Sequence, residues 1–117
     1  MILSVVVPRL GDRTPGGTVH RLLARAGEPL RPGSPLFELR VDLGAARAQD
    51  CPPIVHFRIL SPERGHLRAW TAAEGDALDA GAAVGLATSA PDEATDGPAA
   101  RPLRTSSLVV QVDPLAG

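Results

Sequence analysis

The sequence predicts an all-β fold, a flattened β-sandwich or barrel of two halves related by a quasi-twofold axis, with a further strand in a C-terminal tail. Three observations support this prediction. One pattern of glycines, an acid and aliphatic residues occurs twice at a constant offset of 48 residues. The apolar residues lie in short, largely β-branched runs bounded by glycine and proline, as strands do. Finally, a chain of 117 residues has room for one compact domain and a tail.

The repeated pattern spans residues 17–36 and 65–84. It reads Gly, nine residues, Gly followed by an acid, one residue, Leu, two residues, Gly, two residues and an aliphatic. A copy of this size cannot bury its own apolar face, so the two copies are expected to pack together. The halves then comprise approximately residues 2–41 and 54–88, with Leu30 and Leu78 buried at equivalent positions.

The second and third glycines of each copy predict sharp turns, because glycine tolerates a positive φ that side chains disfavour. These glycines are Gly27 and Gly33 in the first copy, and Gly75 and Gly81 in the second. Glu28 and Asp76, which directly follow the first of each pair, can accept hydrogen bonds from the exposed amides of the turn.

The strands expected in chain order come from apolar runs that end at turn-forming residues. They span residues 2–7, 18–24, 36–41, 54–60, 66–71 and 84–88. Residues 42–53 have no counterpart in either copy and are expected to form an extended central hairpin. Residues 1–88 therefore make up the predicted domain.

The C-terminal part is expected to differ from this domain. Residues 89–102 are rich in Pro, Asp, Ala and Gly without apolar periodicity, which predicts a flexible linker. Residues 103–117 form a tail in which 107–112 have the composition of a strand. Such a strand can pair with an open sheet edge or with another copy of the protein.

Composition excludes several classes of function. A net charge of -1, a pI near 6.3 and 3% aromatic residues give no basic or stacking surface for nucleic acid or an anionic membrane. No run approaches the eighteen or so apolar residues of a membrane span, so we expect a soluble, cytoplasmic protein. A single cysteine, Cys51, excludes an internal disulfide and a multi-cysteine metal site. The histidines lack ligand spacing, so no metal site is predicted.

The repeat resembles the biotinyl/lipoyl carrier-domain family over roughly residues 2–88. Gly27-Glu-Pro-Leu-Arg-Pro-Gly33 and Gly75-Asp-Ala-Leu-Asp-Ala-Gly81 are similar to the turn Gly-Asp-x-Val-x-x-Gly that both halves of this family share. Val7-Pro-Arg-Leu-Gly11 looks like the family's opening Met-Pro-x-Leu-Gly, and Ser61-Pro62 like the step into its second half. The resemblance implies a central hairpin that presents a modifiable lysine.

That lysine is missing here. The matching residues are Arg40-Val-Asp-Leu-Gly44, in which Asp42 is retained and Leu43 stands at the lysine position. All 12 basic residues of the chain are arginine. Since biotin and lipoate are attached through a lysine amine, neither cofactor is expected, and the hairpin is longer than in the family.

Two functions from different classes remain. The first is a non-catalytic interaction or assembly module of a multienzyme system, with Asp42, Leu43 and Cys51 as candidate partner-binding residues. The resemblance implies an acyltransferase, a carboxylase or another biosynthetic component as the protein partner. The alternative is a thiol-based carrier or redox subunit that uses Cys51. No catalytic residue is predicted.

Minor predictions concern single side chains. The three histidines, at positions 20, 56 and 66, are expected to be half-exposed strand residues. The arginines are expected to lie singly on a solvated surface. Trp70, the counterpart of Leu22 in the repeat, is expected to pack in the core.

Overall fold

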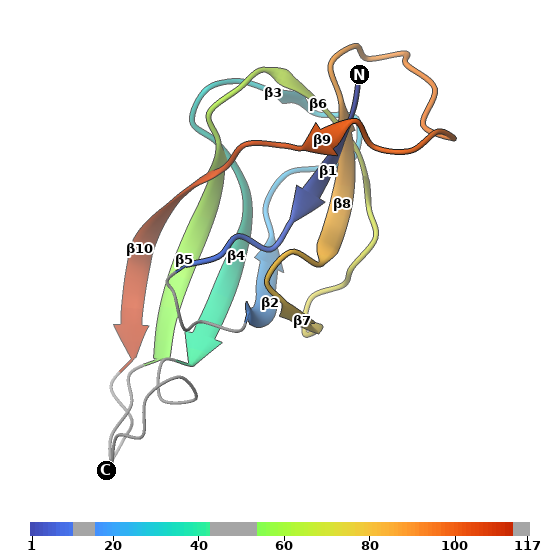
Figure 1. Ribbon diagram of the computed structural model, residues 1–117. Helices are drawn as coiled ribbons and strands as arrows, with labels where there is room; N and C mark the ends of the chain where they lie inside the picture. Colours follow the sequence, from blue (N-terminus) through green and yellow to red (C-terminus); the bar gives the residue numbers. More distant parts are fainter. Residues whose placement is uncertain (11–15, 43–53, 114–117) are drawn as a thin grey trace.

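The computed structural model describes residues 1–10, 16–42 and 54–113. Within these ranges the protein is all-β and contains no helix. Two five-stranded sheets, antiparallel except for one short pair, face each other as in a sandwich (Figure 1). This confirms the predicted class. None of the described elements is a helix that could cross a membrane.

The first sheet has the order β3-β6-β8-β1-β9, and the second has the order β10-β5-β4-β2-β7. The first is formed by β3 (Pro29–Leu30), β6 (Gly65–Trp70), β8 (Ala83–Thr88), β1 (Ile2–Val6) and β9 (Arg101–Pro102). The second is formed by β10 (Ser106–Asp113), β5 (Ile54–Ser61), β4 (Ser34–Asp42), β2 (Gly16–Leu22) and β7 (Ala77–Asp79). All six strands predicted in the domain are present, and β3, β7 and β9 are additional short ones.

The two copies of the repeat are interleaved between the sheets. β2 of the first copy pairs with β7 of the second, and β6 of the second copy pairs with β3 of the first. The Gly27 amide donates to the Leu67 carbonyl at 2.6 Å, and the Gly75 amide donates to the Val19 carbonyl at 2.7 Å. Each copy therefore completes the sheet of the other.

The turn glycines adopt the predicted backbone conformation. Their φ angles are +90°, +92°, +97° and +91° at Gly27, Gly33, Gly75 and Gly81. A Cβ at any of the four would meet nothing within 4 Å, so the requirement for glycine there is conformational rather than steric. Asp76 accepts a hydrogen bond from the Ala73 amide at 2.9 Å, as expected, whereas the equivalent expectation for Glu28 is wrong, because no described residue donates to its carboxylate.

The core lies between the sheets. Its largest fully buried side chain is Phe37 of β4, which packs edge to face against Trp70 of β6 at a centroid distance of 6.0 Å. The Trp70 indole also donates to the Ala24 carbonyl at 2.8 Å. Leu30 is buried as predicted, whereas Leu78 is only half-buried and packs against the core, because it forms part of the wall of an open hollow.

The C-terminal part adds one strand to each sheet. Residues 89–100 return along the N-terminus, where the Ser89 amide donates to the Met1 carbonyl and the Ala100 amide donates to the Ile2 carbonyl at 2.8 Å. β9 then pairs with β1 in parallel, and the chain crosses to the second sheet, where β10 runs antiparallel to β5 (Figure 1). The predicted tail strand thus exists and covers an open sheet edge. The flexibility of residues 89–102 stays a prediction.

Candidate functional site

Of the three predicted partner-binding residues, the structure describes one. Asp42 is the exposed last residue of β4, and its register partner is Ile54, the first residue of β5. The pair lies where the described parts of β4 and β5 end, at the base of the predicted central hairpin. Leu43 and Cys51 lie outside the described residues, so their roles stay predictions.

A hollow of about 250 Å³ opens beside Asp42, between β2, β4 and β7. Arg40, Asp42 and Asp79 bring charges of both signs to its wall, and Leu78 adds an apolar side chain. Its remaining lining residues are Gly16, Gly17, Thr18 and Ala77. Because small-molecule sites typically enclose about 300–1,000 Å³, this open hollow is small for such a ligand and has room for about one side chain.

Glycine is required where β2 and β7 meet below this hollow. A Cβ at Gly16 would lie 2.1 Å from the Leu78 carbonyl oxygen, and φ there is +146°. Gly16, directly before the first copy of the repeat, therefore allows the close approach of the two backbones beside the hollow.

The outer face of the second sheet carries a buried charge that the sequence prediction missed. Glu38 of β4 is 5% exposed and accepts two hydrogen bonds from Arg58 of β5, at 2.9 Å from Nη2 and 3.1 Å from Nε. The two residues are register partners, so their side chains share a face. The prediction that the arginines lie singly is wrong for Arg58, and also for Arg101, because each is paired with a carboxylate.

His56 lies on the next row of this sheet and is 6% exposed. Its ring meets the ring of His20 at a centroid distance of 4.7 Å and an interplanar angle of 72°. The prediction of a half-exposed histidine is wrong at position 56, because a ring from β2 covers it. It is confirmed for His66, while His20 is exposed.

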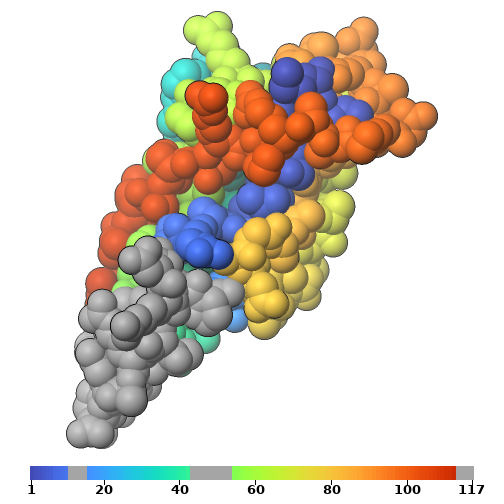
Figure 2. Space-filling model, viewed as in Figure 1, coloured from blue at the N-terminus to red at the C-terminus, as the bar shows by residue number. Residues whose placement is uncertain are grey.

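The most exposed apolar feature among the described strands is β10. Leu108, Val109, Val110 and Val112 are exposed by 42%, 52%, 38% and 54%. Figure 2 shows β10 along one side of the molecule with its side chains open to solvent. β10 is also the end strand of its sheet, so none of the strands described in residues 1–10, 16–42 and 54–113 lies beside its outer edge.

The exposed side chains of β10 lie on both faces of the sheet. Val109 is the register partner of Phe57, which packs against the core, whereas Leu108 is the register partner of Arg58 on the outer face. Register partners share a face in an antiparallel pair. The sequence offers one signal for this strand, the absence of any charged residue from Thr105 to Val112.

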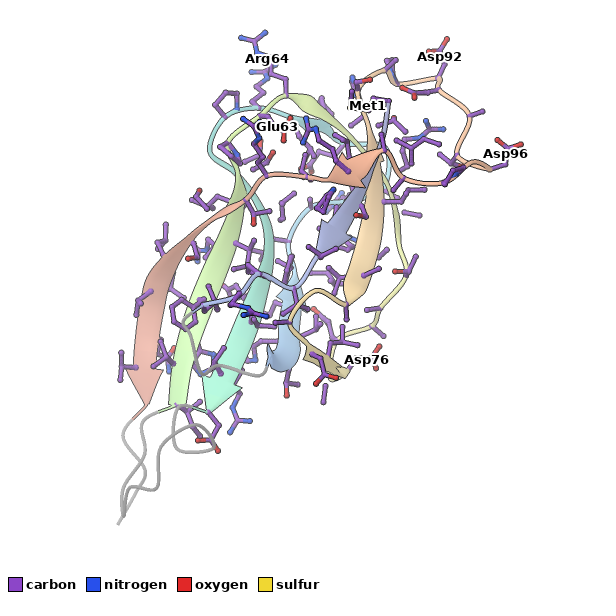
Figure 3. The ribbon with its side chains drawn as sticks, in the orientation of Figure 1. Met1, Glu63, Arg64, Asp76, Asp92 and Asp96 are labelled. Carbon is purple, nitrogen blue, oxygen red and sulfur yellow. The ribbon has the colours of Figure 1, made fainter. Side chains whose placement is uncertain are left out.

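An ion pair and a buried side chain fix the start of this strand. Leu103 is 2% exposed, and its amide donates to the Ser4 carbonyl at 2.8 Å. The Glu63 carboxylate receives two hydrogen bonds from Arg101, at 2.8 and 3.0 Å, and a third from the Arg104 amide at 2.9 Å. Figure 3 shows Glu63 beside the chain that leads from β9 to β10.

These contacts shift the titration of Glu63. The hydrogen bonds from the Arg101 guanidinium, and then the one from the Arg104 amide, lower the pKa of the Glu63 carboxyl from 4.5 to about 2. The same pair raises the pKa of Arg101. We call Glu63, Arg101 and Arg104 the tail clip.

A second contact holds the other end of the C-terminal part. The α-amino group of Met1 donates to the Glu93 carboxylate and to the Ser89 hydroxyl, the latter at 2.8 Å. The hydrogen bond from this amine is the main cause that lowers the pKa of the Glu93 carboxyl. Arg68 reaches the same segment through the Glu93 carbonyl.

Within residues 1–10, 16–42 and 54–113, no group of three or more His, Cys, Asp or Glu side chains could hold a metal ion. The described side chains thus offer an apolar strand edge and a small charged hollow. Comparison of the chain with protein-family models, with curated proteins and with solved structures gives no match.

Proposed function

We propose that this chain is a non-catalytic interaction module of biotinyl/lipoyl-like architecture, which assembles other proteins without carrying covalent biotin or lipoate. The observation that carries the proposal is β10, an edge strand with four large aliphatic side chains between 38% and 54% exposed. Unpaired strand edges template the addition of another strand, and contiguous exposed apolar groups mark interaction sites.

The quasi-twofold relation of the two halves is part of this proposal. It is supported by the strand pairings, which are the same in the two sheets when the halves are exchanged. The pair β2–β7 corresponds to β6–β3, the pair β2–β4 to β6–β8, and the pair β4–β5 to β8–β1. It is also supported by the reciprocal turn hydrogen bonds of Gly27 and Gly75.

The absence of lysine supports a function without a tethered cofactor. Amide attachment of biotin or lipoate needs a primary amine, and an arginine guanidinium stays protonated at physiological pH. The α-amino group is the remaining amine, and it is engaged by Glu93, distant in sequence from the hairpin. In our proposal the long hairpin is a binding element instead.

The base of this hairpin adjoins β10. Asp113, the last residue of β10, is the register partner of Ile54, which in turn pairs with Asp42. A partner that docks on the hairpin end would therefore meet the charged hollow beside Asp42 and the end of β10. As partner we propose an acyltransferase, a carboxylase or another component of a biosynthetic multienzyme system.

Affinity capture with matched variants tests the proposal. The bait is the full chain as wild type, as Val112→Lys in β10, and as Ala69→Lys at an exposed strand position of the other sheet. We expect wild type and Ala69→Lys to capture the same partner protein equally well, and Val112→Lys to fail to capture it. This protein is then purified and its affinity for the three chains measured directly. Equal affinity for all three would refute the role of β10.

Two hairpin variants separate the interaction module from a thiol carrier. Leu43→Asp is expected to weaken partner binding, whereas Cys51→Ser is expected to leave it unchanged. Loss of an associated activity with Cys51→Ser alone would instead support the thiol carrier.

A further inference from the structure

We propose that the edge of β5 is a strand-binding site, and that β10 occupies this site as a built-in, exchangeable ligand. An extended segment of another protein that binds there takes the place of β10. The inference goes beyond the proposed function, which puts a partner on the outer edge of β10, because the site proposed here is the edge that β10 itself covers.

β10 is attached to β5 in the way that a bound peptide is attached to a sheet edge. The two strands are antiparallel and stay in register from Ser106, opposite Leu60, to Asp113, opposite Ile54. Among the strands of the described residues, β5 is the one neighbour of β10 in the sheet. In peptide recognition by strand addition, main-chain hydrogen bonds supply affinity, and pockets for alternate side chains supply specificity.

The side chains of β10 add little to this attachment. Leu108, Val109 and Val112 are each more than 40% exposed, and a bulge at Val110 interrupts the pairing with β5. On the other side of β5, by contrast, Phe37 of β4 is fully buried. Apolar side chains stabilise a strand in proportion to the area that they remove from water. β10 can therefore leave β5 at a much smaller cost than β4.

The chain before β10 is fixed by contacts outside the strand. The buried side chain of Leu103 and the tail clip hold it as far as Arg104, two residues before β10 begins. β10 can thus leave β5 without leaving the molecule, and it competes with any external segment as a tethered ligand of high effective concentration. The contact of β10 with β5 is therefore autoinhibitory.

The register of β10 on β5 indicates which segments this edge accepts. On the core side, Val109 and Val112 lie opposite Phe57 and Val55, so the site takes small aliphatic side chains at two positions three residues apart. On the outer face, Arg58 disfavours a lysine or arginine opposite it. The ligand class is an extended segment without basic residues that carries two aliphatic side chains at this spacing.

The tail clip controls how readily the site opens. Glu63 accepts the hydrogen bond from the Arg104 amide just before β10, and its ion pair with Arg101 is partly open to water. Weakening the clip frees the start of β10 and raises the fraction of molecules in which the β5 edge is accessible. The apparent affinity for an external strand rises by the same factor.

A fluorescent peptide and the purified full chain test the site. The probe is a labelled peptide of residues 104–113, and the control peptide carries Val109→Lys and Val112→Lys. We expect Glu63→Gln to bind the probe about fivefold more tightly than wild type, and both chains to bind the control peptide at least about tenfold more weakly than the probe. No binding of the probe to Glu63→Gln at concentrations up to about 1 mM would overturn the inference.

A disulfide between β10 and β5 distinguishes replacement of β10 from binding to its outer edge. Val55→Cys and Val112→Cys, in a Cys51→Ser background, place two cysteines at register partners, which are close enough for a disulfide. The oxidised chain should bind the probe at least about tenfold more weakly than its matched control, the reduced form of the same variant. Equal binding by the two forms would refute the inference, because addition to the outer edge of β10 requires no displacement.

Hydrogen exchange gives a second readout that needs no cysteines. With excess unlabelled peptide of residues 104–113, the amides of β10 that are protected in the free chain should exchange faster, while the amides of β5 stay protected. Unchanged or slower exchange in β10 on peptide binding would contradict displacement.

These experiments use no captured partner, so they separate this inference from the proposed function. Failure of the peptide to displace β10 leaves a partner on the outer edge of β10 untouched. Conversely, failure of the affinity capture removes the proposed partner and leaves the β5 site to be decided by the peptide.

Discussion

The tail clip should stabilise the attachment of β9 and β10 to the rest of the protein, and Glu63→Gln tests this. The glutamine keeps the shape of the side chain but loses the charge that receives two bonds from Arg101 and one from the Arg104 amide. The side chains of Glu63 and Arg101 are 25% and 37% exposed. Water therefore screens the pair considerably.

The expected loss of stability in Glu63→Gln can be estimated from the pKa shift of Glu63. A fall from 4.5 to about 2 would correspond to about 3 kcal/mol if the pair were fully shielded from water. Exposed ion pairs contribute far less, and a bidentate pair with an added backbone hydrogen bond lies at the upper end of their range. We therefore expect Glu63→Gln to lower the free energy of unfolding by about 1 kcal/mol at neutral pH.

The direction of the Glu63 pKa shift determines how this stabilisation depends on pH. The pKa of Glu63 is lower in the folded protein than in the unfolded chain, so the contribution is complete above pH 4.5 and is lost as the pH falls toward 2. The difference in unfolding free energy between wild type and Glu63→Gln should thus be constant near neutral pH and shrink below pH 4.5.

Urea denaturation provides the free energies, and hydrogen exchange at the Leu103 amide, which donates to Ser4, reports on the tail itself. Glu28→Gln is the matched control, because no described residue donates a hydrogen bond to the Glu28 carboxylate. A double-mutant cycle with Arg101→Gln isolates the pair. A coupling energy below about 0.3 kcal/mol, or a difference that does not depend on pH, would refute this account of the clip.

Three further predictions concern the glycines, the missing lysine and the linker. Gly85→Ala should lower the free energy of unfolding by about 1–3 kcal/mol, because the new Cβ would lie 2.8 Å from Trp70 Cε3 and 2.9 Å from the Ala69 carbonyl oxygen. Gly75→Ala should lower the free energy of unfolding by about 1–2 kcal/mol, because alanine disfavours the φ of +97°. Gly97→Ala introduces neither a close contact nor an unfavourable φ, so its free energy of unfolding from thermal melts should stay within about 0.5 kcal/mol of wild type. Incubation with a biotin or lipoate ligase, cofactor and ATP should leave the intact mass unchanged, and an adduct within the hairpin would contradict the chemistry argued from arginine. In hydrogen exchange, the amides of residues 94–99 should be unprotected while Ala100, which donates to Ile2, is protected, and slow exchange throughout 89–102 would contradict a flexible linker.

Several features of this protein could be predicted from the sequence because their causes are local. A positive φ at Gly27 and Gly75 depends on the absence of a side chain at those positions. The strands follow from runs of β-branched and aliphatic residues between turn formers, and the hydrogen bond from Ala73 to Asp76 spans three residues. The all-β class is the sum of such local preferences.

Other features depend on which strands become neighbours, and only the tertiary structure decides that. The burial of Glu38 against Arg58, and of His56 beneath His20, requires the register of β4 with β5 and the bulge in β2. The tail clip joins residues 38 positions apart in the chain. A sequence read locally contains no information on such pairs, because the contacts that define them form only when distant segments are packed together.

The candidate site shows the same division. The composition of residues 107–112 predicts a strand, and the absence of charge makes it apolar. Whether that strand is covered or exposed depends on its place in the sheet, and this was decided by the crossing from β9 to the free side of β5. An apolar strand in the middle of a sheet would be ordinary core. At the edge, with both faces partly open to water, the same residues form an exposed apolar surface, because burial is a property of the neighbours and not of the segment itself.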